Sequence, residues 1–131
     1  MSARNIYPRN NQRNGAKVKE KESDLAVTIF QRLQFIPKHK AVYFSVPNER
    51  PGGTNIRQMV RLKRQGLTKG VSDLWILMPD RCIGIELKTS KGRQSTTQKE
   101  FESWCNLVGI EYELVRSLEE LEIILKKWGL S

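Results

Sequence analysis

A pair of adjacent predicted strands joined by a tight turn constrains the fold of this chain more than any other feature. The first strand, 74–78, is continuously apolar, which is typical of a strand in the centre of a sheet. A Pro-Asp-Arg turn follows it. In the second strand, 82–88, side chains alternate between two faces, so Glu86 and Lys88 share one face and the isoleucines share the other. Gly84, on the face of Glu86, leaves room for a close approach.

A single acid, Asp73, stands at the entrance of the first strand, and a hairpin brings it beside Glu86. Two carboxylates and the amine of Lys88 then meet at one end of the sheet. Carboxylates give a hard divalent cation oxygen ligands and leave other positions to water and phosphate. The cation polarises a phosphoryl oxygen, and a nearby amine orients the attacking water or stabilises negative charge. The alternative is a surface hairpin with ordinary solvated charges, and the spacing alone favours neither explanation.

Further motifs surround these three side chains, in the order Pro47-Asn48-Glu49, a basic helix 61–66 ending in glycine, Gly70-Val71-Ser72-Asp73-Leu74, Glu86-Leu87-Lys88 and Gln98-Lys99. This order resembles the VRR-NUC (virus-type replication-repair nuclease) family of the PD-(D/E)xK nuclease superfamily, over roughly residues 22–126. Ser72 stands where that family usually has proline, which concerns the rigidity of the turn more than the neighbouring Asp73. For Asn48 and Glu49 the residues themselves indicate no firm chemical role. Positioning of the substrate backbone is one option, and plain turn chemistry is the favoured explanation for Asn48.

The resemblance implies an α/β fold with a restriction-endonuclease-like core, in which helices flank a mixed central β-sheet. It implies a Mg²⁺- or Mn²⁺-dependent endonuclease that cleaves branched DNA, such as Holliday junctions, in replication, repair or recombination, and it suggests a homodimer. The implied site has two carboxylate ligands and one carbonyl ligand for the metal, a lysine that positions or activates water, and two further polar groups: Asp73, Glu86, Leu87, Lys88, Glu22 and Gln98.

Two of these residues also have ordinary structural explanations. Glu22 lies at the first turn of a helix predicted over 23–35, where the helix dipole favours an acid. Glu20 is its rival for the site if the helix register differs. Gln98 forms an S-x-x-Q capping box with Ser95 at the start of another helix. Capping and a contact to the site can coexist in Gln98.

The remaining pattern predicts a strand at 41–46, helices at 56–65 and 95–109, a strand at 110–115 and a last helix that ends near residue 129. The order is helix, strand, helix, strand, strand, helix, strand, helix, which fits a mixed sheet flanked by helices. The apolar stripes of the two middle helices are expected to face inward: Ile56, Met59 and Val60 in the first, and Phe101, Trp104, Cys105 and Val108 in the second.

Charge favours a polyanionic partner. The chain has a formal net charge of +9, which favours nucleic acid first and an anionic membrane surface second. A stripe of three arginines at i, i+4 and i+7 destabilises an isolated helix, so a polyanion is a reason for its presence. The predicted nucleic-acid contacts are this stripe, a lysine before the first hairpin strand and two cations after the second: Arg57, Arg61, Arg64, Lys69, Lys91 and Arg93.

The size of 131 residues predicts one folded domain over 22–131, preceded by a disordered basic arm over 1–21. No apolar run is long enough to span a membrane and no secretory signal is visible, so we expect no membrane partner. We expect the cytoplasm of a bacterium or a phage-infected host cell. Cys82 and Cys105 lack metal-type spacing, and the single histidine leaves little material for a histidine-based site.

Two rival functions fit part of this pattern. A non-catalytic basic nucleic-acid-binding module explains the charge. It does not explain why Asp73, Glu86 and Lys88 fall in register, because carboxylates near DNA carry an electrostatic cost unless a cation screens them. A sequence-specific restriction enzyme is the second rival, although 131 residues leave little protein for a separate recognition domain.

Overall fold

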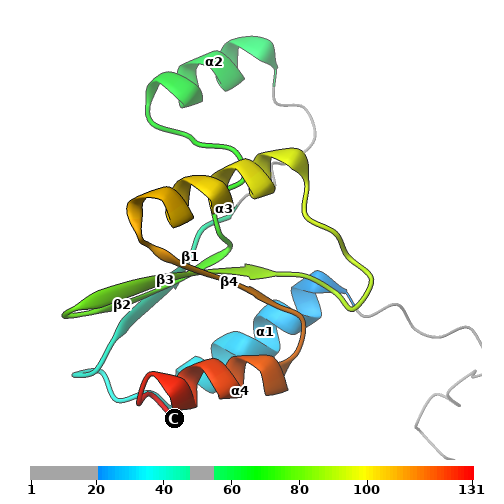
Figure 1. The fold of residues 1–131 in the computed structure, drawn as a ribbon. Coiled ribbons are helices and arrows are strands. Elements are labelled where there is room, and N and C mark those ends of the chain that lie inside the picture. The colour runs from blue at the N-terminus through cyan, green and yellow to red at the C-terminus, as the bar shows by residue number, and fades with distance from the viewer. Residues whose placement is uncertain (1–20, 48–54) are drawn as a thin grey trace, which may run out of the picture.

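Four strands form one mixed sheet in the order β1-β2-β3-β4 (Figure 1). The structure, a computed structural model, describes residues 21–47 and 55–131. β1 (Val42–Ser45), β2 (Leu74–Met78) and β3 (Arg81–Leu87) are antiparallel neighbours, and β4 (Glu111–Val115) runs parallel to β3. The predicted hairpin is therefore the centre of the sheet, and the mixed α/β class is confirmed.

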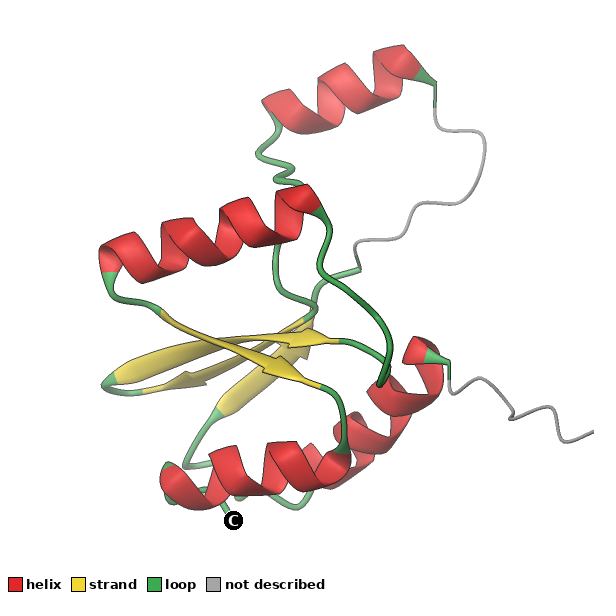
Figure 2. Cartoon of the chain, turned by 45° about the vertical axis from the view of Figure 1, so that its right-hand side comes forward, coloured by secondary structure: helices red, strands yellow, loops and turns green. Residues whose placement is uncertain are grey.

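Helices cover both faces of the sheet. α1 (Glu22–Leu33) and α4 (Leu118–Lys127) lie on one face, and α3 (Thr96–Val108) lies on the other (Figures 1 and 2). α2 (Ile56–Arg64) stands beyond α3, away from the sheet. The element order is the predicted one, and the predicted bounds agree with the observed bounds to within two residues.

The core lies between the sheet and the α1–α4 layer. The alternation predicted for β3 is confirmed, since its isoleucines and Leu87 are buried toward that layer. Burying each such side chain stabilises the fold by roughly 1.5–3 kcal/mol. The largest buried apolar side chains of this layer come from four elements, α1, β2, β3 and α4: Ile29, Leu33, Leu74, Ile76, Ile83, Ile85, Leu121 and Leu125.

The inward stripes predicted for the two middle helices are wrong in part. In α3 only Cys105 is buried, while Trp104 is 58% exposed and Val108 is 57% exposed. α2 buries none of its residues, and Ile56 is 82% exposed. Helical periodicity shows which side chains share a face, but it does not show whether the sheet has room for that face. Here α3 alone covers its face of the sheet and α2 does not reach it (Figure 1).

α2 depends on local capping because tertiary packing does not support it. Asn55 Oδ1 accepts a hydrogen bond from the Gln58 backbone N–H at 2.8 Å, and Gln58 reaches back to the Asn55 backbone, which completes a capping box. A helix of nine residues is marginal on its own in water. The exposed position of α2 therefore leaves its arginine stripe open to solvent.

Gly70 fixes the loop between α2 and β2 against the first turn of α3. Its φ is +78°, and a Cβ there would lie 2.2 Å from the Thr97 carbonyl oxygen. Gly70→Ala is expected to lower the free energy of unfolding by roughly 3 kcal/mol, because it adds a steric clash to left-handed strain. Urea denaturation measures this loss.

Gly66→Ala is the matched control for that substitution. Gly66 has a φ of +97°, but a Cβ there would meet nothing within 4 Å. We expect a cost of only about 1 kcal/mol, from backbone strain alone. Equal losses in the two variants would show that the contact between Gly70 and α3 does not contribute to stability.

Three predictions fall partly or wholly on residues that the structure does not describe. Residues 1–20 of the predicted basic arm, which include Glu20, lie outside the described residues. Asn48 and Glu49 lie outside them as well. Within the described ranges, no helix has the length and apolar character needed to cross a membrane.

Candidate metal centre

The hairpin brings Asp73 and Glu86 together. Leu74 pairs with Ile85 across β2 and β3, so the residues next to them meet at the end of the sheet. The Leu87 backbone N–H donates to Asp73 Oδ2 at 2.9 Å, which fixes the carboxylate against β3. In this structure Leu87 thus contacts the site through its amide, and its side chain belongs to the core.

Glu22 joins the pair from a distant part of the sequence. It is the first residue of α1, and the side chain is 48% exposed. One carboxylate oxygen from each of Glu22, Asp73 and Glu86 lies within 4.8 Å of the other two. These three residues, called the carboxylate cluster below, come from α1, the start of β2 and the end of β3.

Lys88 places its amine beside this cluster. Its Nζ lies 3.8 Å from Glu86 Oε1 and 4.0 Å from Glu22 Oε1, and the side chain is only 11% exposed. The Lys88 backbone N–H donates to the Val115 carbonyl at 3.0 Å, which extends the pairing of β3 with β4. The amine is therefore held near two carboxylates at the edge of the buried region.

Gln98 serves the helix cap and the cluster at the same time. Its Nε2 donates to Glu86 Oε1 at 2.5 Å, while its Oε1 accepts from the Ser95 backbone N–H at 2.8 Å. Ser95 Oγ in turn accepts from the Gln98 backbone N–H at 3.2 Å. The capping box fixes the rotamer of Gln98, and that rotamer aims the amide at Glu86.

Glu86 is the electrostatic centre of the site. Its side chain is fully buried, and the pKa of its carboxyl is raised from 4.5 to about 8. Burial is the largest cause, the charge of Asp73 adds to it, and Lys88 opposes it. Among the described residues, no N–H or hydroxyl group donates to Glu86 Oε2, and a hydrogen bond with Asp73 favours the protonated form of the Glu86 carboxyl. A buried carboxylate oxygen of this kind is costly unless a proton or a cation neutralises it, so the donor set fits a divalent cation.

The cluster lies along a cavity of about 430 Å³ that is open to solvent. Its lining includes Glu22 and Asp73 of the cluster together with Lys88 and Gln98, and the apolar residues Phe30 and Pro47 are also part of it; the fully buried Glu86 does not line the cavity. Its volume lies within the range of small-molecule sites. The cavity therefore gives a phosphate group access to the cluster.

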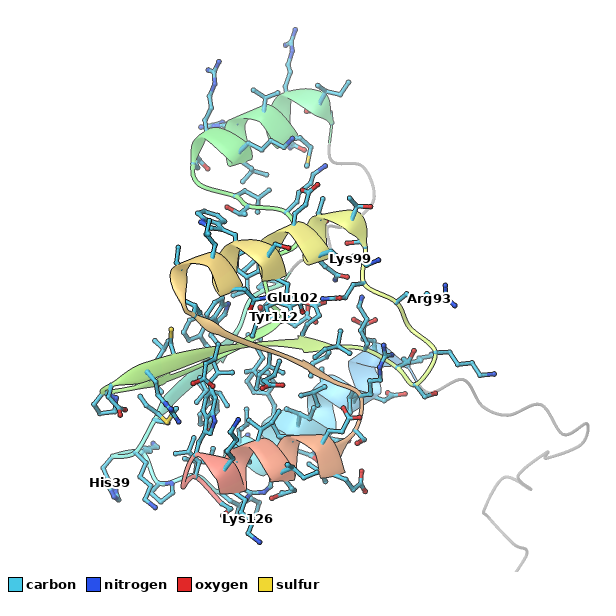
Figure 3. All side chains as sticks on the ribbon, viewed as in Figure 1. His39, Arg93, Lys99, Glu102, Tyr112 and Lys126 are labelled. Atoms are coloured by element: carbon cyan, nitrogen blue, oxygen red, sulfur yellow. The ribbon has the colours of Figure 1, made fainter. Side chains whose placement is uncertain are left out.

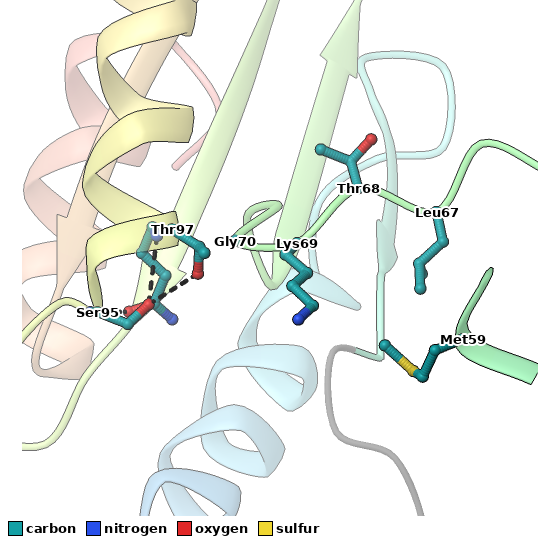
Figure 4. A pocket seen from close by; sticks show the side chains of 8 residues that line it. Met59, Leu67, Thr68, Lys69, Gly70, Ser95 and Thr97 are labelled. Atoms are coloured by element: carbon teal, nitrogen blue, oxygen red, sulfur yellow. Dashed lines mark hydrogen bonds between the residues drawn. The ribbon is translucent and has the colours of Figure 1, made fainter. Parts of the chain in front are cut away.

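Figure 4 shows a second cavity, of about 370 Å³. Gln98 is among the residues that line both cavities. Lys69, Thr97 and Met59 line this second cavity. Of the six predicted nucleic-acid contacts, Lys69 is the one that lines this cavity, beside the start of α3.

The other predicted nucleic-acid contacts divide into two groups. Lys91 and Arg93 are exposed in the loop that follows Lys88, and Arg93 extends outward from that loop (Figure 3). The arginine stripe is exposed on α2 beside Ile56 and Val60. Helical geometry puts Met59 on the opposite face of α2, so the stripe turns away from the second cavity. The loop cations thus lie near the cluster, and the stripe forms a separate surface.

Sequence reasoning missed the role of Arg116. This residue lies between β4 and α4, and its Nη1 donates to two carbonyl oxygens of the loop after Lys88. These bonds tie the loop to the end of β4. No spacing or motif in the sequence marks Arg116, because its partners lie more than twenty residues away.

Ser72 and Gly84 meet behind the cluster. Ser72 is fully buried, and a Cβ on Gly84 would lie 2.6 Å from Ser72 Oγ and 3.0 Å from the Trp75 ring. The room that Gly84 was predicted to leave is thus taken by protein side chains. This close packing fixes the backbone that leads into Asp73.

Three clustered carboxylates, two of which line an open cavity, define a candidate divalent-metal centre with the amine of Lys88 and the amide of Gln98 beside them. The chain matches no protein-family model, no curated protein and no solved structure. The chemistry of the centre therefore has to be inferred from its own groups.

Proposed function

We propose that this protein is a divalent-metal-dependent endonuclease that hydrolyses phosphodiester bonds of DNA. The observation that carries the proposal is the carboxylate cluster within 4.8 Å, with the Lys88 amine 3.8 Å from Glu86. Hard oxygen ligands suit Mg²⁺ or Mn²⁺, and an adjacent amine suits a reaction that develops negative charge on phosphate oxygens. The basic charge of the chain supports a polyanionic substrate.

Glu22, Asp73 and Glu86 would hold the cation. Oxygens bound to one Mg²⁺ at about 2.1 Å lie at most about 4.2 Å apart, so the cluster needs only a small side-chain adjustment. When bound, the ion polarises a phosphoryl oxygen and lowers the pKa of its water. The Leu87 carbonyl as a further ligand is part of the proposal.

Side chains beside the cluster would position the water and the metal ligands. Lys88 would position the attacking water or take up charge, since its amine already lies between two carboxylates. Gln98 would fix the orientation of the Glu86 carboxylate through the 2.5 Å hydrogen bond. Burial of Glu86 and Lys88 keeps both groups in one rotamer, which supports a preorganised site.

The proposal extends to the enzyme family, the substrate class and the oligomeric state. The motifs of the sequence, and the order of strands around the cluster, support a VRR-NUC-type enzyme with a restriction-endonuclease-like core. Branched DNA is the proposed substrate class, and a homodimer would match substrates with two-fold symmetry. The separation of the stripe on α2 from the loop cations supports contacts to more than one part of such a substrate.

Cleavage assays on three DNAs test the function. Linear, flap and four-way-junction DNA are incubated with wild type and Lys88→Met, in Mg²⁺ or in EDTA. We expect wild type to cut the branched DNAs in Mg²⁺ only, and Lys88→Met to bind them without cutting. Binding by both proteins with no cleavage in either buffer would instead identify a non-catalytic binding module. Cleavage of one linear sequence alone would identify a restriction-type enzyme.

Neutralising the stripe is expected to weaken DNA binding in a salt-dependent way. The triple variant Arg57→Gln, Arg61→Gln and Arg64→Gln removes three phosphate-binding charges from exposed positions. The slope of log affinity against log salt should then fall in magnitude by about 2.7. Fluorescence anisotropy over a salt series measures it.

A second triple variant supplies the matched control. Lys38, Lys126 and Lys127 are exposed, and Lys126 lies at the far end of the molecule from α2 (Figure 3). Their replacement by glutamine removes the same charge. If the two triple variants lower the slope equally, α2 has no special place in DNA binding and the effect comes from net charge.

A further inference from the structure

The side chain of Arg116 ties the first turn of the loop after β3 to the end of β4. Arg116 Nη1 donates to the Thr89 carbonyl at 2.7 Å and to the Gly92 carbonyl at 2.6 Å. Both bonds are partly buried, and both acceptors are backbone atoms. The guanidinium therefore fixes the path of the loop whichever side chains the loop carries.

This loop covers the aliphatic chain of Lys88. The Gly92 backbone N–H donates to the Thr89 carbonyl at 3.1 Å, which closes a turn directly after Lys88. A Cβ on Gly92 would lie 3.4 Å from Lys88 Cδ, so the backbone of Gly92 packs on that chain. The cover explains why a lysine at the edge of an open cavity is only 11% exposed.

Arg116 is itself well anchored. Its backbone N–H donates to Glu120 Oε2 at 2.7 Å, in the capped first turn of α4. The preceding Val115 is buried, and its carbonyl accepts from the Lys88 backbone N–H. Lys88 is thus fixed from both sides, by β4 at its backbone and by the loop over its side chain.

We infer that Arg116 is a positioning residue, which holds the turn Thr89–Gly92 over Lys88 and so keeps the Lys88 amine at the carboxylate cluster. The inference rests on the proposed function for its catalytic consequence and on the hydrogen bonds alone for its structural consequence. Without Arg116 the two carbonyls can turn to water, the turn opens, and the Lys88 side chain gains rotamers that point away from Glu86.

Arg116→Met tests the catalytic consequence, because methionine keeps apolar bulk but donates no hydrogen bond. We expect kcat for four-way-junction DNA to fall about 10- to 100-fold, while KM changes by less than about threefold. Arg116→Lys keeps the charge but lacks the planar fork, so it should restore kcat only in part. If Arg116 instead contacts DNA phosphate, KM rises, the salt slope falls and lysine restores most of the binding.

Acetylation of Lys88 tests the structural consequence without any substrate. Native protein is treated with acetic anhydride and each lysine is followed by mass spectrometry. We expect Lys88 to react about tenfold faster in Arg116→Met than in wild type, because the cover has opened. Lys126 and Lys127 are exposed in both proteins and should react at unchanged rates.

Arg81→Met is the matched control for the loss of an arginine. Arg81 begins β3 at the end opposite to Lys88, where it pairs with Glu111 at 3.4 Å. We expect it to leave both kcat and Lys88 acetylation unchanged. Should Arg116→Met fail to fold, Arg116→Lys carries both measurements.

The outcomes separate the inference from the proposed function. If wild type cuts no DNA, the proposed function fails and acetylation alone decides the role of Arg116. If wild type is a nuclease but Arg116→Met keeps its kcat and its slow Lys88 acetylation, the inference is overturned and the function stands.

Discussion

Glu86→Gln is expected to abolish metal-dependent cleavage while leaving DNA binding intact. The substitution keeps the size of the side chain and a hydrogen-bonding partner for Gln98, but it removes the buried carboxylate of the cluster. Losing about 4 kcal/mol of transition-state stabilisation by the metal corresponds to a rate about 1,000-fold lower. Single-turnover cleavage of four-way-junction DNA in Mg²⁺ measures this loss, and anisotropy in EDTA measures binding.

Metal binding should be lost in the same variant. In wild type, Mn²⁺ at about 100 times its Kd should stabilise the fold by about 2.7 kcal/mol, which appears as a rise in Tm. Glu86→Gln should lose most of that rise. Glu119→Gln is the control, since Glu119 is exposed in the first turn of α4, and it should behave as wild type. Cleavage by Glu86→Gln at the wild-type rate would show that the cluster is not the catalytic metal site.

The metal-free protein is expected to lose stability as the pH rises from about 4.5 to about 8. The folded protein raises the pKa of Glu86 across that range, mainly through burial, so the folded state binds a proton that the unfolded state has released. The contribution of this group to stability is complete below pH 4.5 and is lost as the pH rises through about 8. A pKa change of this size corresponds to roughly 5 kcal/mol at most.

Urea denaturation of wild type and Glu86→Gln across this pH range isolates the effect, because other titrating groups are common to both proteins. We expect wild type to become less stable relative to Glu86→Gln as the pH rises. Added Mn²⁺ should reverse the trend for wild type, since the cation needs the ionised carboxylate and competes with the proton. A difference that is independent of pH would show that Glu86 titrates alike in the folded and unfolded states.

Local patterns in the sequence predicted much of this centre. Asp73 and Glu86 meet because the short turn sets the register of the two strands, and a one-residue slip would move the isoleucines of β3 to the other face of the sheet. Gln98 was marked by the capping box, which depends on residues three apart and survives in the fold. Glu22 was marked by the family resemblance and by its place at the first turn of a predicted helix, and the structure puts it in the cluster.

Local patterns in the sequence did not predict which helix faces are buried. The apolar residues of α2 and the outer residues of α3 follow helical periodicity as well as those of α1 do, yet Ile56 and Trp104 are exposed. Periodicity shows the side of a helix that is apolar. Whether that side is buried depends on how many helices one face of a four-stranded sheet accepts.

The sequence by itself determined the order of elements, the centre of the sheet and the pairing of Asp73 with Glu86, because each depends on neighbours along the chain. Tertiary structure alone decided the outward position of α2, the raised pKa of Glu86 and the hold of Arg116 on the loop after Lys88. The physical reason is that burial and long-range hydrogen bonds depend on how separate elements pack, and local periodicity carries no information about that packing.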